Sequence, residues 1–299
     1  GLCGEMDRIL AVQNYYKNLS PDTREIELGA WYESVHGYQM NFKNPSTLNE
    51  KIQWLKLYDS TPIKTKLADK YAVRGWVKEK LGEDVLIPMI GIYECYEDID
   101  FAHFPDQFVL KMSHGCGMNQ IVTDKNSFSV NASRKKFDYW RKVYYGLDER
   151  QELHYRDIPH RIIAETYLED LSGYLTDYKV YCFNGTPVFI QVIKNRFGQS
   201  EMSFYDCNWN VMPFYHSYYN KGDGKDPRPE QLEQMVYMSS QLAEGFSLVR
   251  VDWYLIGSKQ IYFGEMTFTP ASGARHWLPD GYDRILGESI ILPPKFVLI

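Results

Sequence analysis

The strongest constraint on the fold of this chain is a pair of strand-like runs near its C-terminal end. The runs cover residues 249–255 and 260–267, and apolar and aromatic side chains recur in both. A short turn centred on Gly257 and Ser258 separates them, which is the pattern of a β-hairpin. The second run continues into a loop, 268–273, that contains small and polar residues.

Three charged side chains lie on this predicted hairpin. A two-residue turn places Arg250 opposite Glu265 and Asp252 opposite Phe263. Because side chains alternate along a strand, Asp252 and Glu265 become diagonal neighbours on one face, about 7–8 Å apart at the backbone. Adjacent carboxylates need a cation, so the hairpin holds either a cross-strand ion pair with Arg250 or a divalent metal. The hairpin alone leaves both interpretations open.

Composition and charge exclude several classes of protein. The 299 residues are 44% hydrophobic and 24% charged, as in globular proteins with one large domain or a few small ones. A net charge of −6 disfavours a broad nucleic-acid-binding surface. No apolar run is long enough to span a membrane, and no signal peptide is visible. The five cysteines lack CxxC spacing and the seven histidines lack an HExxH pattern, which argues against zinc or disulfides and for a reducing cytoplasm.

Hydrophobic periodicity and turn signals divide the chain into three predicted parts. Residues 1–85 are mostly helical, and Thr47 with Glu50 three residues later forms a capping box at a helix start. Residues 86–168 and 169–299 combine strands with a few helices. The strands are joined mostly by short turns, which predicts an α+β fold with mainly antiparallel sheets.

The remaining predicted elements follow from the same signals. A helix from Lys64 to Leu81 ends at Gly82. Asn184-Gly185 is the strongest short-range hairpin signal in the chain. The other predicted elements are strands at 85–95 (buried, interrupted by Pro88), 107–112, 120–124, 161–170, 177–183 and 186–193, and helices at 134–145 and from Pro229 onward.

A glycine-bearing loop follows Lys111, which ends an apolar strand. The loop, 113–118, reads Ser-His-Gly-Cys-Gly-Met. Glycines let backbone N–H groups approach phosphate oxygens, and a nearby lysine neutralises phosphate charge. The spacing matches neither a P-loop nor a dinucleotide-binding turn, so an ordinary turn is the alternative to a phosphate site.

Two more strand residues could face the same ligand. Glu165 closes an apolar strand ahead of Thr166 and could accept a hydrogen bond from an adenine amino group, or simply reach water. Lys179 lies in the strand before Asn184 and is either a phosphate ligand or a solvated strand lysine.

The order of these pieces resembles the ATP-grasp superfamily of carboxylate–amine ligases. It runs strand lysine, glycine loop, strand glutamate, strand lysine, and then 250-RVD-252 followed by 265-EMT-267. A closer resemblance, covering most of the chain, is to the TupA-like ATP-grasp family, which is associated with teichuronopeptide and other cell-surface polysaccharide synthesis. It rests on 45-PSTLNEKIQWLKL-57, 68-ADKYAVRGWV-77, 109-VLKMSHGCG-117, 177-DYKVYCFNG-185 and 262-YFGEMTFTPASG-273.

The resemblance implies an ATP-grasp fold, in which two α+β lobes grip the nucleotide after a helical N-terminal region. It implies that Asp252, Glu265 and Thr267 hold Mg²⁺, and that Arg250 and Lys179 are catalytic. Thr267 departs from the asparagine common in the superfamily, and its hydroxyl is a weaker oxygen donor. The implied ATP-binding residues are Lys111, Ser113, His114, Gly115, Cys116, Gly117, Met118, Glu165, Thr166, Tyr167, Leu168, Asp170 and Lys179.

The implied reaction is ATP-dependent amide formation through an acyl phosphate. The acid would be the uronate of a sugar nucleotide or of a capsular or other cell-surface polysaccharide precursor. The amine would be an amino acid or a small amino alcohol, free or phosphorylated. Candidate substrate-binding residues are Lys194, Arg196, Ser272, Gly273 and Arg275.

Two other function classes stay open at this stage. A metal-dependent glycosyltransferase could use the paired acids but has no use for Lys111 and its loop. A non-catalytic nucleotide-binding module has no need of Arg250. The expected compartment is the cytoplasm, with peripheral association with polysaccharide machinery also compatible. Because the chain opens on Gly1, it could be one domain of a longer protein.

Overall fold

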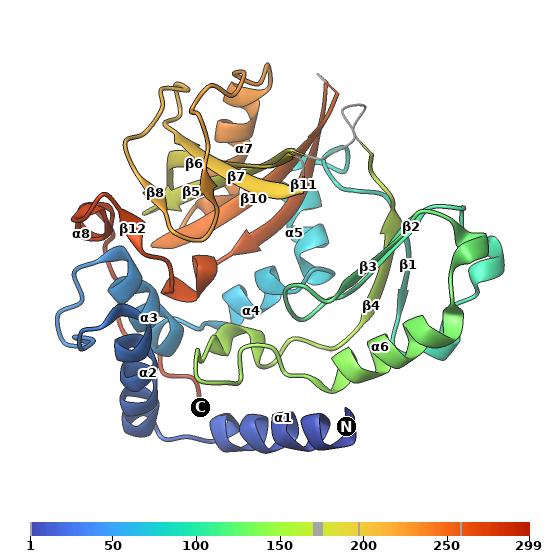
Figure 1. Ribbon diagram of the computed structural model, residues 1–299, viewed down its shortest axis with the longest axis horizontal. Coiled ribbons are helices and arrows are strands. Elements are labelled where there is room, and N and C mark those ends of the chain that lie inside the picture. Colours follow the sequence, from blue (N-terminus) through green and yellow to red (C-terminus); the bar gives the residue numbers. More distant parts are fainter. Residues whose placement is uncertain (1, 170–175, 197, 258) are drawn as a thin grey trace.

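The fold is α+β, with two mainly antiparallel sheets facing each other across the molecule (Figure 1). The computed structural model describes residues 2–169, 176–196, 198–257 and 259–299. Within these ranges, no helix is both long and apolar enough to cross a membrane. The division at residues 85 and 168 stays a prediction, although each sheet lies within one of the two predicted strand-rich parts.

The smaller sheet has four antiparallel strands in the order β1-β4-β2-β3. They are β1 (Met89–Tyr93), β2 (Phe108–Met112), β3 (Asn119–Val122) and β4 (Ile162–Thr166). Helix α6 (Val130–Lys142) buries Phe137 against this sheet. The strand predicted over 85–95 is present as β1, but it begins only after Pro88 and lies half-exposed at the sheet edge, so its predicted burial was wrong. Proline cannot donate to a ladder, so it marks the strand start.

The larger sheet has six strands in the order β11-β10-β5-β6-β7-β9. They are β5 (Thr176–Phe183), β6 (Thr186–Arg196), β7 (Gln199–Tyr205), β9 (Asn220–Lys221), β10 (Leu248–Ile256) and β11 (Gln260–Thr267). Phe183 pairs with Thr186, which confirms the hairpin at Asn184-Gly185. Helix α7 (Leu232–Ala243) covers one face, and a two-stranded sheet of β8 (Tyr215–His216) and β12 (Trp277–Leu278) flanks the other side.

The N-terminal region is helical, as predicted. Its helices are α1 (Leu2–Lys17), α2 (Pro21–His36), α3 (Leu48–Tyr58), α4 (Pro62–Ala68) and α5 (Ala72–Leu81), and α8 (Tyr282–Glu288) joins them from the C-terminal end. The capping box of Thr47 and Glu50 is present at α3. The single helix predicted from Lys64 to Leu81 is instead two helices. The Asp69 carboxylate accepts the N–H groups of Tyr71 and Ala72, which starts a new helix at that point.

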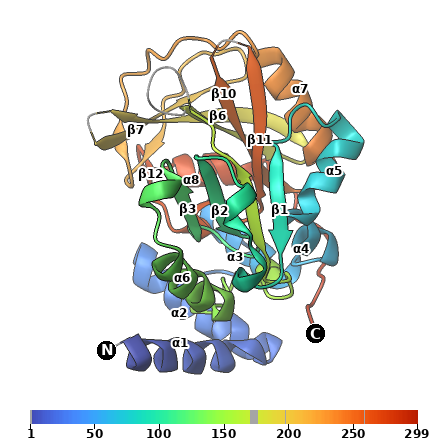
Figure 2. The same ribbon diagram turned by 90° about the vertical axis from the view of Figure 1, so that its right-hand side faces the viewer.

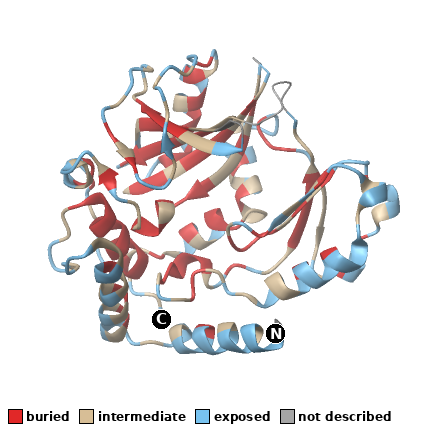
Figure 3. Cartoon of the chain, viewed as in Figure 1, coloured by how far each residue is buried: buried red, intermediate tan, exposed pale blue. Residues whose placement is uncertain are grey.

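Helix α3 packs against α2, α8 and the segment after β11, on the side of the larger sheet (Figures 2 and 3). Every one of its residues is buried, including Lys56. Lys56 Nζ donates to Gln53 Oε1 at 2.7 Å and to the carbonyl and hydroxyl oxygens of Ser272 at 2.9 and 2.8 Å. Helix α3 therefore fixes the segment after β11, which lies beside the candidate site.

The register of the β10–β11 hairpin differs from the prediction. Ile256 pairs with Gln260, and Asp252 lies directly opposite Glu265 instead of opposite Phe263. The register shifts between Asp252 and Trp253, where Gly264 is the extra residue of a β-bulge. The bulge brings the two carboxylates closer than a regular ladder does. Ser258, the predicted second turn residue, lies outside the described residues.

Replacing Gly264 with alanine should disturb this bulge. An added Cβ would lie 3.0 Å from the Tyr254 ring and 3.1 Å from the Asp252 carbonyl oxygen, so the two strands would have to separate slightly. We expect a loss of about 1–2 kcal/mol in the free energy of unfolding, measured by urea denaturation. Alanine at Gly75, which has open space around its Cβ position, is the matched control. Equal stability of the two variants would contradict a packed bulge.

Candidate active site

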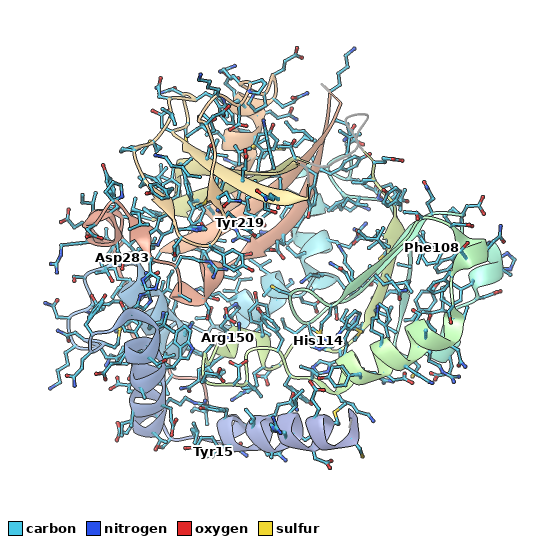
Figure 4. The ribbon with its side chains drawn as sticks, in the orientation of Figure 1. Tyr15, Phe108, His114, Arg150, Tyr219 and Asp283 are labelled. Atoms are coloured by element: carbon cyan, nitrogen blue, oxygen red, sulfur yellow. The ribbon has the colours of Figure 1, made fainter. Side chains whose placement is uncertain are left out.

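A cavity of about 390 Å³ lies where β10 and β11 meet the loop before β4 and the segment after β11. Charged side chains reach it from separate elements: Lys179 from β5, Arg250 from β10 and Glu265 from β11. Arg150 and Tyr219 also line it, and Figure 4 shows them near the centre of the molecule. The fold thus gathers predicted residues that are up to 159 positions apart, from Cys116 to Arg275, around one cavity.

Asp252 is the buried centre of an ion network beneath the cavity. Arg250 Nε and Nη2 donate to its two oxygens at 2.8 and 2.9 Å, and Lys179 Nζ donates at 2.8 Å. Lys179 also pairs with Asp177 at 2.8 Å. Burial raises the pKa of Asp252 to about 6 although both cations favour its charged form. Burial and Arg250 disfavour charged Lys179, but Asp252, Asp177 and Glu265 outweigh them and raise its pKa above the usual range.

Glu265 and Thr267 extend this network toward the cavity. Arg250 Nη2 donates to Glu265 Oε1 at 3.3 Å, and the Thr267 hydroxyl donates to the same oxygen at 3.1 Å. Burial opposes the charged form of Glu265, but Lys70, Arg250 and Lys179 outweigh it and lower the pKa of Glu265 to about 2. Glu265 is therefore a carboxylate at neutral pH, placed to attract a cation.

These residues fit a magnesium ion only in combination with a phosphate ligand. Among the described residues, no three His, Cys, Asp or Glu side chains form a metal cage. Mg²⁺ is commonly held by one or two carboxylates together with substrate phosphates, so such a cage is not required. Glu265 faces the cavity, whereas both oxygens of Asp252 already accept hydrogen bonds from Arg250 and Lys179. Asp252 could ligate a metal only if Lys179 or Arg250 moved toward another anion.

Lys70 is a site residue that the sequence prediction missed. Its Nζ donates to the Gly115 carbonyl at 2.6 Å and lies 3.9 Å from Glu265 Oε2. It connects the glycine loop of the smaller sheet with the hairpin of the larger one. Lys70 follows α4 directly, and nothing in the local spacing distinguished it from the other lysines of the helical region.

A second cluster of charges surrounds Glu165 at the end of β4. Lys111 Nζ pairs with Glu165 Oε1 at 2.8 Å, and Arg74 Nη1 lies 3.9 Å from the same oxygen. Arg74 also donates to the Ile87 carbonyl at 2.8 Å. Lys111 and Glu165 are thus neighbours, as their placement on adjacent strands β2 and β4 requires.

The residues after Glu165 connect the two sheets. The Thr166 N–H donates to the Pro88 carbonyl at 3.0 Å. Tyr167 and Leu168 follow β4 and are half-buried. Asp170, the last predicted nucleotide contact in this segment, lies outside the described residues.

The glycine loop divides into an anchored half and a half near the cavity. The Ser113 hydroxyl donates to the Pro159 carbonyl at 2.7 Å, and His114 Nε2 donates to the Val143 carbonyl at 2.8 Å. His114 also stacks on His160 with ring centroids 3.6 Å apart. Both side chains are buried in the smaller lobe and neither lines the cavity described here.

The second half of the loop approaches the cavity. Cys116 lines it, and burial together with Glu265 raises the pKa of its thiol. Gly117 has a positive φ of 74°, which favours glycine. Met118 is buried in the core of the smaller sheet. Gly115 has its carbonyl bound by Lys70.

Two of the predicted substrate residues belong to β6, and of these Lys194 is not placed at the cavity. Gln191 and Ile193 line the cavity, so Lys194 lies on the opposite face of the strand, where it pairs with Asp226. The side chain of Arg196 lies outside the described residues.

The other three predicted substrate residues lie beside the cavity. Ser272 and Arg275 line it, and the Gly273 carbonyl accepts from His36 Nε2 at 2.8 Å. Arg275 stacks on the Tyr218 ring, 3.6 Å from its centroid. Among the described residues, Arg275 makes no ion pair with a carboxylate, so its charge is available to an anionic ligand.

Comparison with known families gives a match over most of the chain. A family model described as TupA-like ATPgrasp matches residues 50–291. A search of curated proteins gave no match.

Several solved ligase structures are similar in fold. D-alanine–D-alanine ligase from Bacillus anthracis complexed with ATP gives a TM-score of 0.41 at 15% identity, over 81% of this chain and 64% of that one. N5-carboxyaminoimidazole synthetase from Staphylococcus aureus gives 0.40 at 12% identity, over 68% and 44%. D-alanyl-alanine synthetase A from Vibrio cholerae gives 0.42 at 12% identity, over 75% and 61%. The chain therefore spans about half to two thirds of these proteins.

Proposed function

Because the chain belongs to the TupA-like ATP-grasp family, we propose that it is an ATP-dependent ligase that joins a carboxylate to an amine. The carboxylate oxygen would attack the γ-phosphorus of ATP, giving an acyl phosphate and ADP. The amine nitrogen would then displace phosphate from the acyl carbon, leaving an amide. The favoured acid is a uronate on a sugar nucleotide or a cell-surface polysaccharide precursor, and the favoured amine is an amino acid or small amino alcohol, free or phosphorylated.

The ion network around Asp252 is the observation that supports this proposal most directly. Two carboxylates, Asp252 and Glu265, lie opposite each other; Arg250 donates to both, and Lys179 donates to Asp252 from the neighbouring strand β5. In the proposed complex Glu265, with Asp252 and the weaker donor Thr267, would hold Mg²⁺, which neutralises phosphate charge. Lys179 would turn from Asp252 toward the phosphates.

Arg250 would stabilise the oxyanion that forms at the acyl carbon. It lines the cavity, and its guanidinium is held in place by Asp252 and Glu265. A fixed donor costs no reorganisation when charge develops, and one such donor contributes about 3 kcal/mol to transition-state stabilisation. A protein that only binds nucleotide has no use for a cation at this position.

The adenine end of the nucleotide would lie at the junction of the two sheets. Glu165 through Leu168 would hold the base, and Lys111 would contact the phosphates after releasing Glu165. The part of the glycine loop beside the cavity, from Gly115 to Gly117, would cover the phosphates and exclude water from the acyl phosphate. The anchored Ser113 and His114 would act as the base of this lid.

Arg275 is the favoured contact for the acidic substrate. Its charge has no carboxylate partner in the described part of the chain, and it shares the cavity with Arg250 and Ser272. Lys194 is a weaker candidate, since it pairs with Asp226 on the other face of β6.

ADP release tests this function. Purified protein would be mixed with ATP, Mg²⁺, a panel of uronates and a panel of amines, and ADP would be measured by a coupled assay. We expect sustained ADP release over many turnovers only when a uronate and an amine are both present. Release of ADP without dependence on any carboxylate would exclude the ligase, and consumption of a sugar nucleotide without ATP use would favour a glycosyltransferase.

A further inference from the structure

Glu152 is a buried carboxylate in the wall of the same cavity, and no role proposed so far uses it. It is 3% exposed and lines the cavity from the loop before β4. The Thr269 hydroxyl donates to Oε1 at 2.6 Å, whereas Oε2 has no hydrogen-bond partner among the described residues. Leaving a buried polar atom unpaired destabilises a fold, so such an atom beside a cavity points to a missing ligand.

The loop that carries Glu152 is held rigidly. The Glu152 N–H donates to the Gly146 carbonyl at 3.0 Å, and a Cβ on Gly146 would come within 2.6 Å of the Glu152 carbonyl oxygen. The preceding Gln151 has a positive φ of 48°, and its side chain is fixed by two hydrogen bonds to Arg24 at 3.2 and 3.0 Å. Strained backbone of this kind persists where the surrounding structure fixes it, often at functional sites.

The two cations near Glu152 already bind other groups. Arg150 pairs with Asp148 at 3.1 Å. Lys56 has its ammonium bound by Gln53 and by Ser272. Burial, together with the charge of Glu152, raises the pKa of three neighbouring groups, Tyr145, Tyr155 and Cys116. Neither cation donates a hydrogen bond to Oε2 of Glu152, so a cationic group entering the cavity could bind this oxygen.

We propose that Glu152 binds the ammonium group of the amine substrate and accepts a proton from it; this inference rests on the ligase function proposed above. Most primary amines are cations at neutral pH and cannot attack until a proton is removed. Glu265 is assigned to Mg²⁺ in the proposed complex and lies 3.9 Å from the ammonium of Lys70, whereas Oε2 of Glu152 has no hydrogen-bond partner among the described residues. Burial raises the pKa of Glu152 against the opposing effect of Lys56, which makes it a stronger base than an exposed glutamate.

The atoms and electrons of this amide-forming step balance. Oε2 of Glu152 takes one proton from the ammonium, and the freed nitrogen lone pair forms the C–N bond to the acyl carbon. The bond from that carbon to the phosphate oxygen breaks, and inorganic phosphate leaves with the electron pair. The second nitrogen proton passes to the departing phosphate or to water, and Glu152 returns its proton to solvent. No oxidant or further co-reactant is needed.

Hydroxylamine, used as the nucleophile in place of an amine, distinguishes proton removal by Glu152 from the other steps of the reaction. It is a much weaker base than an alkylamine, so it is neutral at neutral pH and attacks acyl phosphates without prior deprotonation. With ATP, Mg²⁺ and glucuronate, Glu152→Gln should lose about 10²–10⁴-fold in amide formation with glycine or ethanolamine. Hydroxamate formation by the same variant should stay within a few-fold of the parent protein, and raising the pH should restore part of the lost rate with ordinary amines.

Two more variants complete the experiment. Glu265→Gln should lose both reactions, because Glu265 acts in the ATP-dependent step that precedes attack by either nucleophile. Glu152→Asp, which keeps the carboxylate on a shorter side chain, should retain more activity with ordinary amines than Glu152→Gln. Equal loss with both nucleophiles, or no loss with either, would overturn the assignment of Glu152. A parent protein that makes neither hydroxamate nor amide with any uronate would overturn the ligase function itself, and this inference with it.

Discussion

Glu265→Gln should reduce carboxylate-dependent ADP release on the order of 10³-fold. The substitution keeps the shape of the side chain but removes the charge that we propose attracts Mg²⁺ at the cavity. It also leaves Arg250 and Lys70 facing a neutral amide, since both now act on the Glu265 carboxylate. The loss corresponds to about 4 kcal/mol of transition-state stabilisation.

The structure offers a matched control for this experiment. Glu233 lies on the exposed face of α7 and pairs with Arg228, so Glu233→Gln removes a carboxylate and an ion pair at a distance from the cavity. We expect that variant to keep full activity. Thermal unfolding of both proteins would show whether the fold is retained. Near-normal turnover by a well-folded Glu265→Gln protein would remove the metal role of Glu265.

The sequence predicted those elements that depend on short-range signals. The capping box at Thr47 and the turn at Asn184-Gly185 each involve a few neighbouring residues, and both are confirmed. The break at Asp69 was missed because an aspartate within a helical pattern can either cap a new helix or face solvent. The hairpin of β10 and β11 was predicted, but its register was not. Ile256 pairs with Gln260 instead of Lys259, and one bulge residue then shifts every pair beyond it by a further position.

Residues that reach the cavity from distant loops had no local signal. Lys70 precedes the smaller sheet and Glu152 lies in the loop before β4, and only the tertiary fold places them near Glu265 and Thr269. Lys194 shows the opposite problem. A lysine at the end of a strand was a reasonable substrate contact, but alternation along β6 places it on the face away from the cavity. Periodicity alone could have separated Lys194 from Gln191 if the inward face of β6 had been known.

His154→Phe should make the protein more stable in acid than its parent. His154 is 1% exposed, its ring centroid lies 4.2 Å from that of Tyr155, and its Nε2 has no partner among the described residues. Burial, reinforced by Lys64 and Lys56, lowers the pKa of His154 well below its usual 6.5. The folded protein therefore keeps His154 neutral while the unfolded chain takes up a proton below pH 6.5.

The sign of the effect follows from this difference in proton binding. Lowering the pH from 6.5 favours the unfolded state by about 1.4 kcal/mol per pH unit through His154, so the penalty reaches about 2 kcal/mol at pH 5. Phenylalanine does not titrate and would pack beside Tyr155 and Phe268. The variant should therefore not lose this part of the free energy of unfolding in acid. Urea unfolding at pH 7 and pH 5 gives the free energy of unfolding of the variant and of its parent. The difference between the two proteins isolates the contribution of His154, because the other titrating groups contribute equally to both. His103→Gln is the control substitution, since it removes an exposed histidine and leaves the buried His154 in place. If the variant and its parent lost stability equally between the two pH values, His154 would not be neutral in the folded protein.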